Sequence, residues 1–348
     1  MKKQLDHYFH TLVNSYAILF FSQNKVFGII LFVASMLNPS AGISGLISVS
    51  LAIAMVSALG FDKSISKTGL YTFNSLLLGL GFGAFFAFNV LFWFWLALSC
   101  IFCLLLSINF SAFLGKYELP ALSIPFAITF WTVLIAGNGY ATMGLMQKDS
   151  YVVFEIYSGN KIHIDTLNQY LEYSNISYLI SLFFRSLSAI IFQNSMICGI
   201  LIAIGLLIHS RIAFSLVSLG LIVAHTINQY TGIYPDGISN YHLGANFMMI
   251  SLSIGGVYLI PSNRSYIWAI IATAVMILLV NGLSRVLGIY NLPIFSLPFS
   301  LLTIGLLYFF KVRNHAHKLH LTYFQNYSPE LNLYPVSYTH LRAHETCV

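Results

Sequence analysis

The sequence predicts an all-α polytopic membrane protein made of two inverted repeats, each with five transmembrane helices and one re-entrant helix. Of its 348 residues, 58% are hydrophobic and only 7% are charged, whereas a soluble domain carries about 25% charged residues. The octet "LPALSIPF" at 119–126 returns as "LPIFSLPF" at 292–299. Two further landmarks recur at nearly the same offset, which indicates an internal repeat.

The order of apolar runs gives the predicted elements. Runs in the first half lie at 25–38, 42–60, 70–87, 89–110 and 120–137, and runs in the second half at 195–209, 212–227, 240–260, 266–288 and 293–310. Shorter apolar runs at 10–22 and 178–193 precede the two sets. A crossing needs about 20 residues, so we predict re-entrant or interfacial helices at these two places.

These runs divide the chain into segments. We predict a first repeat at 1–137, an extracytoplasmic linker at 138–177, a second repeat at 178–310 and a cytoplasmic tail at 311–335. The last stretch, "VSYTHLRAHETCV" at 336–348, changes abruptly in character and resembles a translated sequencing adapter. We therefore leave it out of the fold prediction.

The repeat rests on three pairs of landmarks that share almost one offset. Gly28 matches Gly199, Asn74 matches Asn246, and the first octet matches the second. Five crossings are an odd number, so the second repeat must enter the membrane from the opposite side. If both termini are cytoplasmic, eleven lysines and arginines lie on the cytoplasmic side of the membrane. Four lie on the other side, namely Lys148, Lys161, Arg185 and Arg285. This split follows the positive-inside rule.

Composition and charge placement exclude several functions. Every Asp and Glu lies in a predicted loop or terminus, which argues against a pump or a proton-coupled transporter. Cys100 and Cys103 form a CxxC inside an apolar run, without a second ligand pair, so we expect no metal and no cofactor. We interpret the net charge of +6 as membrane topology rather than affinity for nucleic acid. "GLGFGA" at 79–84 lies in an apolar span, so we expect it to serve close helix packing.

The octets are the candidate functional elements. Proline removes a backbone donor and disrupts the interior of a helix at a cost of about 3 kcal/mol, and the carbonyls it frees must face protein or a water-filled cavity. Two such breaks near the midplane would place acceptors and the hydroxyls of Ser123 and Ser296 around a pore on the pseudo-two-fold axis. A small, neutral, donor-rich solute fits that lining. Packing kinks without a site are the other interpretation.

The octets and "GLYTFNSLLLGLGFGAFF" resemble signature motifs of the urea transporter family, over about residues 10–334. The resemblance implies a channel-like, homotrimeric facilitator of urea in the bacterial inner (plasma) membrane, among membrane lipids, with a pore in each protomer. Carried onto this sequence, the signature residues are Leu119, Pro120, Ser123, Pro125 and Phe126, and Leu292, Pro293, Ser296, Pro298 and Phe299. The slot-forming residues are Phe21, Phe73 and Leu77, with repeat mates Phe192, Ala245 and Met249.

One departure concerns the two re-entrant helices. The family commonly has Gln or Glu where this chain has Ile18 and Ala189. Two hydrogen-bonding side chains at the filter ends are therefore lost together. We predict weaker selectivity for urea, with larger amides or other small neutral solutes admitted.

Three other functions compete with this prediction. A secondary transporter with inverted repeats shares broken helices but should show a buried ionisable residue or ion dependence. A non-transporting membrane scaffold should lose Ser123 and Ser296 or fill the slot. An enzyme needs a nucleophile, a base and an orienting group together, and no span pair of this sequence offers them.

Overall fold

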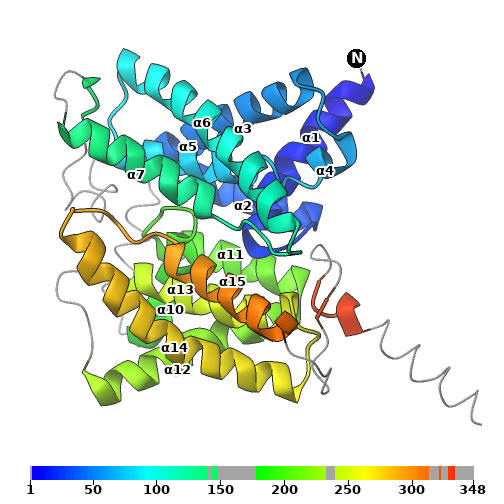
Figure 1. The fold of residues 1–348 in the computed structure, drawn as a ribbon, viewed down its shortest axis with the longest axis vertical. Coiled ribbons are helices and arrows are strands. Elements are labelled where there is room, and N and C mark those ends of the chain that lie inside the picture. The colour runs from blue at the N-terminus through cyan, green and yellow to red at the C-terminus, as the bar shows by residue number, and fades with distance from the viewer. Residues whose placement is uncertain are drawn as a thin grey trace, which may run out of the picture.

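The computed structural model describes residues 2–139, 143–146, 178–232, 240–312, 321–322 and 328–333. The regular elements of this part of the chain are helices (Figure 1). Most of the predicted linker at 138–177 and all of 336–348 lie outside the described residues.

The first half contains one element more than predicted, the short helix α4. Asparagines begin three of its helices: the side chains of Asn24, Asn38 and Asn89 accept N–H groups in the first turns of α2, α3 and α6. The elements are α1 (Lys2–Ala17) with a 3-10 turn (Ile18–Phe20), α2 (Lys25–Met36), α3 (Pro39–Ala58), α4 (Lys63–Lys67), α5 (Phe73–Phe85), α6 (Val90–Gly115) and α7 (Ile124–Gly139).

In the second half, serines take over the capping role. Ser195, Ser210 and Ser262 accept N–H groups at the starts of α11, α12 and α14. The elements are α10 (Tyr178–Ala189), α11 (Met196–His209), α12 (Arg211–Thr231), α13 (Asn240–Leu252) with a π-helical turn (Ser253–Val257), α14 (Asn263–Gly288) and α15 (Leu297–Val312).

Several helix bounds and backbone conformations recur in the second half where the sequence landmarks place them. The bounds of α14 are those of α6 shifted by the offset between the two octets, and the bounds of α15 are those of α7 shifted in the same way. The described non-glycine residues with positive φ also fall into matching pairs: Phe21 with Phe192, Glu118 with Asn291, and Leu122 with Phe295. Bulky residues adopt this conformation rarely, so its recurrence reflects specific local packing in both halves.

Four helices are long and apolar enough to cross a membrane: α3, α6, α12 and α14. Residues Leu5–Phe20 and Lys25–Met36 form a fifth candidate, bent by 85° at the break between them. Shorter apolar helices lie where the remaining spans are predicted, at 73–85, 124–137, 196–209, 244–257 and 297–312. The helical, apolar character of the predicted spans is therefore confirmed.

The prediction that prolines break the interior of a helix is wrong. The helices that follow the octets start at Ile124 and Leu297, so Leu119–Ser123 and Leu292–Ser296 precede them as non-helical chain. Pro125 and Pro298 each occupy the second helical position, where a backbone N–H has no intrahelical acceptor. These prolines therefore start helices rather than break them, and the interior penalty does not arise.

Close packing at "GLGFGA" is confirmed. α5 lies directly against α3, and a Cβ added to Gly79 would come within 2.4 Å of the Ser44 carbonyl oxygen. A Cβ added to Gly83 would come within 2.1 Å of the Ser40 carbonyl oxygen. Both glycines thus let the two backbones approach as larger residues could not.

The two halves occupy the upper and lower parts of the molecule in Figure 1. α2 packs against α11, and α7 contacts α15. The buried amide of Gln193 donates to the carbonyls of Ala34 and Ser35, both at 2.9 Å. Ser22 Oγ lies 3.1 Å from His209 Nδ1. Polar as well as apolar contacts therefore join the halves.

A short part of the tail packs on the second half. The Thr322 N–H donates to the Tyr258 carbonyl at 2.9 Å, and the Ile212 N–H donates to Glu330 Oε1 at 3.0 Å. Burial by itself raises the pKa of the Glu330 carboxyl, but the hydrogen bonds from Ile212 and Ser210 outweigh it, so the pKa lies below its usual value. The carboxylate thus caps the start of α12.

Candidate functional site

The two octets meet at their serines. Ser123 Oγ lies 2.6 Å from Ser296 Oγ and 3.0 Å from Ser300 Oγ in the first turn of α15. Ser123 and Ser300 are buried, and Ser296 is half-buried. The structure therefore brings together the two serines that the sequence singled out, and it adds a third hydroxyl.

The two octets reach this cluster from opposite sides. Lys311, at the end of α15, forms an ion pair with Glu118 and donates to the Tyr117 carbonyl at 3.0 Å, beside the start of the first octet. The hydrogen bond from Lys311 Nζ to Glu118 Oε2 and the charge of Lys311 lower the pKa of the Glu118 carboxyl. Trp131 Nε1, in α7, donates to the Pro293 carbonyl of the second octet at 2.8 Å. α7 and α15 thus run away from the serines in opposite directions.

The backbone just before each serine is strained. Leu122 has φ of 48° and Phe295 has φ of 46°, a left-handed conformation that costs an L-residue roughly 1–2 kcal/mol. Asn74 Nδ2 on α5 donates to the Leu122 carbonyl at 3.1 Å. Asn246 Nδ2 on α13 donates to the Phe295 carbonyl at 2.8 Å. The two landmark asparagines therefore contact the octets directly.

Aromatic rings pack beside the octets, and two of the predicted slot phenylalanines, Phe21 and Phe192, each contact the octet of the other half. The ring centroid of Phe21 lies 6.1 Å from that of Phe299 and 5.7 Å from that of Tyr258. The centroid of Phe192 lies 5.6 Å from that of Phe126. These pairs meet edge-on, which is a favourable geometry for aromatic rings.

Further rings on the second side were not predicted. Phe295 lies 5.1 Å from both Phe126 and Phe130 and 6.0 Å from Phe85, measured between ring centroids. Phe85 and Phe130 lie outside both octets, and Phe295 takes the place of Leu122 in the other half. Apolar composition alone does not distinguish such residues from lipid-facing phenylalanines.

The remaining predicted slot residues lie on α5 and α13. Leu77 and Met249 are buried, whereas Phe73 and Ala245 are half-buried. Within each helix the pair is four residues apart and therefore shares a face. Both helices also carry the asparagines that contact the octets.

Ile18 begins the 3-10 turn that follows α1, and Ala189 ends α10, so both lie just before the turns of Phe21 and Phe192. Both are buried, with exposed fractions of 9% and 8%. Neither side chain carries a hydrogen-bonding group. Both positions are therefore buried and apolar.

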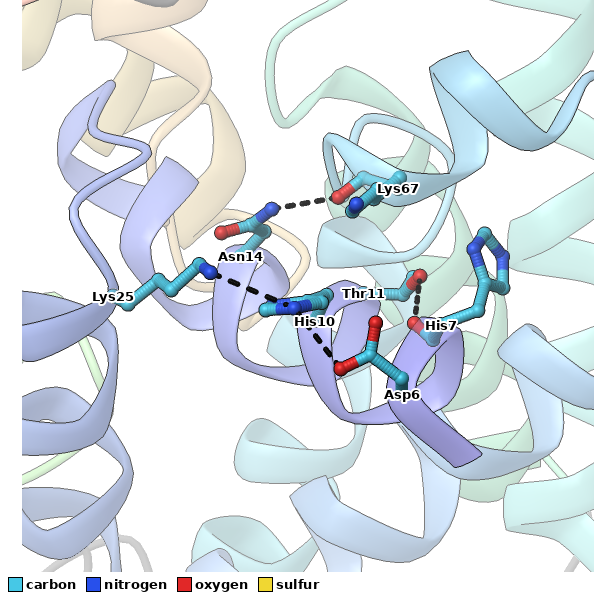
Figure 2. A network of polar contacts seen from close by, with 7 residues as sticks. All are labelled: Asp6, His7, His10, Thr11, Asn14, Lys25 and Lys67. Carbon is cyan, nitrogen blue, oxygen red and sulfur yellow. Dashed lines mark hydrogen bonds and ion pairs between the residues drawn. The ribbon is translucent and has the colours of Figure 1, made fainter. Parts of the chain in front are cut away.

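A polar cluster on α1 supports the first of these turns (Figure 2). His10 Nε2 lies 3.3 Å from Asp6 Oδ1 on the same helix and 3.5 Å from Lys25 Nζ at the start of α2. Asn14 Nδ2 donates to the Lys67 carbonyl at the end of α4, at 2.7 Å. These contacts link α1 to α2, across the bend that carries Phe21, and they also link α1 to α4.

The octet region offers hydroxyls, carbonyls and ring edges. Among the described residues, no group of three or more His, Cys, Asp and Glu side chains could hold a metal ion. Cys100 Sγ donates to the Ser48 carbonyl at 3.2 Å, away from the octets. The arrangement can exchange hydrogen bonds with a neutral solute.

A comparison with protein families gives a match over most of the chain. The model described as "Urea transporter" matches residues 9–311. The matched range contains both octets, both turns with their phenylalanines, and the helices α5 and α13. The match confirms the resemblance seen in the sequence.

Proposed function

Because the chain belongs to the urea transporter family and is thus an integral multi-pass membrane protein, we propose that it acts as a channel-like facilitator of urea or a similar small neutral amide. Movement is passive, down the solute gradient. The observation that carries the proposal is the meeting of Ser123, Ser296 and Ser300 at the point where the two octets converge.

The chemistry of the site suits this solute. Urea is planar and carries N–H donors on two nitrogens and an acceptor on its oxygen. An unpaired amide group taken out of water costs roughly 2–7 kcal/mol, so acceptors must replace its hydration. Serine hydroxyls both donate and accept, and each backbone carbonyl has two lone pairs. We expect edge-on rings such as those of Phe21 and Phe192 to line a flat opening for a planar molecule.

The hydroxyls of Ser123 and Ser296 bond to each other in this structure. Passage therefore exchanges this bond for bonds to the solute. Ser123 can keep its contact with Ser300 during the exchange. A neutral hydrogen bond contributes only about 0.5–1.5 kcal/mol net, so the exchange is compatible with rapid flux.

We further propose inverted repeats with the pore on their axis, and a homotrimer with one pore in each protomer. The recurring bounds of α6 and α14 and of α7 and α15, together with the paired positive-φ residues, support the repeat. The opposite directions of α7 and α15 support its inversion. The trimer and its lipid contacts are proposed by analogy with the family.

We expect selectivity for urea to be weaker than the two octets by themselves would predict. Ile18 and Ala189 place aliphatic groups where polar side chains are common in the family. N-methylurea and formamide should therefore permeate alongside urea, because fewer fixed partners select for the full donor set.

Stopped-flow measurement of purified protein in proteoliposomes tests the proposal. Urea flux should exceed that of empty liposomes, and Ser123→Val and Ser296→Val should each reduce it about tenfold, since removing a buried partner costs about 1–3 kcal/mol. Ser218→Val on α12, whose hydroxyl donates to the Phe214 carbonyl of its own helix, is the control. Flux equal to that of empty liposomes would reject the channel, and parent-like flux in both serine variants would reject the site.

A further inference from the structure

We propose that Asn74 and Asn246 are positioning residues for permeation: each holds the backbone turn that aims one serine hydroxyl at the other. This inference deepens the proposed function and rests on it. Neither side chain contacts Ser123 or Ser296 in the hydrogen bonds above; each acts through the carbonyl of the preceding residue.

The first step is the location of the two bonds. Asn74 donates to the carbonyl of Leu122, and Asn246 donates to that of Phe295, the residues directly before the two serines. A peptide carbonyl and the next N–Cα bond belong to one rigid plane. Fixing the orientation of that carbonyl therefore fixes the direction of the N–Cα bond of the following serine.

The second step is the backbone conformation that is held. Leu122 and Phe295 have positive φ, which side-chain-bearing residues adopt only where surrounding contacts enforce it. Without the amide donor, the turn can relax toward an ordinary conformation. The serine that follows would then move away from the serine of the other octet. At present the two Oγ atoms lie 2.6 Å apart.

The third step is burial. The exposed fractions of Asn74 and Asn246 are 1% and 3%. A polar side chain buried in an apolar bundle persists when its hydrogen bonds are made inside the protein. Here they are made to the octets, 48 and 49 residues along the chain, rather than to the asparagine's own helix.

The two positions are unequal. Asn246 Oδ1 also accepts the N–H of Phe299 at 3.3 Å, so one amide bridges the turn and the first turn of α15. Asn74 Oδ1 has no hydrogen-bond partner among the residues that the structure describes. We therefore expect a larger effect from substitution of Asn246 than of Asn74.

Asn74→Leu and Asn246→Leu test the inference, because leucine matches asparagine in shape but lacks the donor. Urea flux per reconstituted protomer should fall about tenfold in Asn246→Leu and less in Asn74→Leu. The urea to N-methylurea ratio should change in both. The control is Asn281→Leu, whose amide donates to the Ile277 carbonyl within α14. It should leave flux and ratio at parent values.

Asn→Asp variants at both positions separate positioning from simple stability. A protonated aspartic acid keeps one O–H donor in nearly the same shape, and burial favours the protonated form. At about pH 5 the Asp variants should conduct better than the Leu variants, relative to parent at the same pH. Equal flux in the Asp and Leu variants would contradict the donor role.

A second measurement does not depend on urea. The double variant Ser123→Cys with Ser296→Cys should form a disulfide on oxidation with copper-phenanthroline, since the two hydroxyl oxygens are 2.6 Å apart. Mass spectrometry of the linked peptides gives the yield. Adding Asn246→Leu should lower the yield severalfold, whereas adding Asn281→Leu should not.

The outcomes separate the two proposals. If the parent conducts urea no faster than empty liposomes, the transport function is rejected. If Asn246→Leu loses the cross-link in the same set of experiments, the positioning role is retained. Parent-like cross-linking and parent-like flux in both Leu variants overturn the positioning role and leave the transport function standing.

Discussion

Ser300 is the residue that makes the hydroxyl cluster asymmetric. It lies 3.0 Å from Ser123, and its counterpart in the first half is Ala127, which has no hydroxyl. The second half thus supplies two hydroxyls to the cluster and the first half supplies one. In the proposed passage of solute, Ser300 is the partner that Ser123 retains when its bond to Ser296 is exchanged.

We expect Ser300→Ala to lower urea flux about fivefold, because a lost neutral hydrogen bond is worth about 1 kcal/mol. Stopped-flow flux in proteoliposomes measures this. Ser251→Ala is the control, since Ser251 is equally buried and donates to the Leu216 carbonyl. Parent-like flux in Ser300→Ala would mean that the third hydroxyl has no part in passage.

Residue-scale prediction from the sequence had a clear limit. Ser123 and Ser296 were found because they hold the same place in two copies of one motif. Asn74 and Asn246 were recognised only as landmarks, although a matched polar residue inside two apolar spans was already a signal. Ser300 gave no such signal, because its contact exists only where α15 begins beside the other octet.

The contact between α3 and α5 shows how helix packing determines which residues an element tolerates. Gly79 and Gly83 lie four residues apart on α5, and the backbone of α3 fills the space where their side chains would lie. Helices in lipid associate through such close contacts rather than through the hydrophobic effect. α5 also carries Asn74, which donates to the Leu122 carbonyl of the first octet.

Gly83→Val should destabilise the protein by about 1–3 kcal/mol through overpacking, visible as a lower melting temperature in detergent. Gly282→Ala on α14, where an added Cβ meets nothing within 4 Å, is the control and should melt like the parent or slightly higher. Equal melting of Gly83→Val and parent would contradict the close contact.

The octets illustrate what sequence reasoning missed about elements. Two prolines five residues apart predict an interrupted helix, whereas the helices begin at Ile124 and Leu297. The position of a proline relative to the helix start decides whether it is costly or favourable. Asn74 and Asn246, which are distant in sequence, donate hydrogen bonds to the chain just before these two starts.

The whole molecule is held together by contacts between corresponding elements of its halves. α2 packs on α11, α7 contacts α15, and the Gln193 amide bonds across the first of these pairs. A site built at such a junction changes if the halves shift relative to each other. The serine cluster therefore depends on the packing of both halves.

Inversion predicts opposite labelling of corresponding positions. Lys116 and Ile289 are exposed counterparts that directly follow α6 and α14. In membrane vesicles, a membrane-impermeant maleimide should label Lys116→Cys from the cytoplasmic side and Ile289→Cys from the other. The unsubstituted protein gives the background, and its described cysteines are buried. Labelling of both positions from one side would reject the inverted repeat.

Composition, apolar runs and the octet motif are local features of the chain, so they were enough to predict the class of protein, the positions of the apolar helices and the family. Tertiary packing sets where the helices after the octets begin and which hydroxyls meet. It also sets which asparagines hydrogen-bond to the octets. Those features depend on contacts between residues 48 to 177 positions apart, and such contacts form only when the two halves pack.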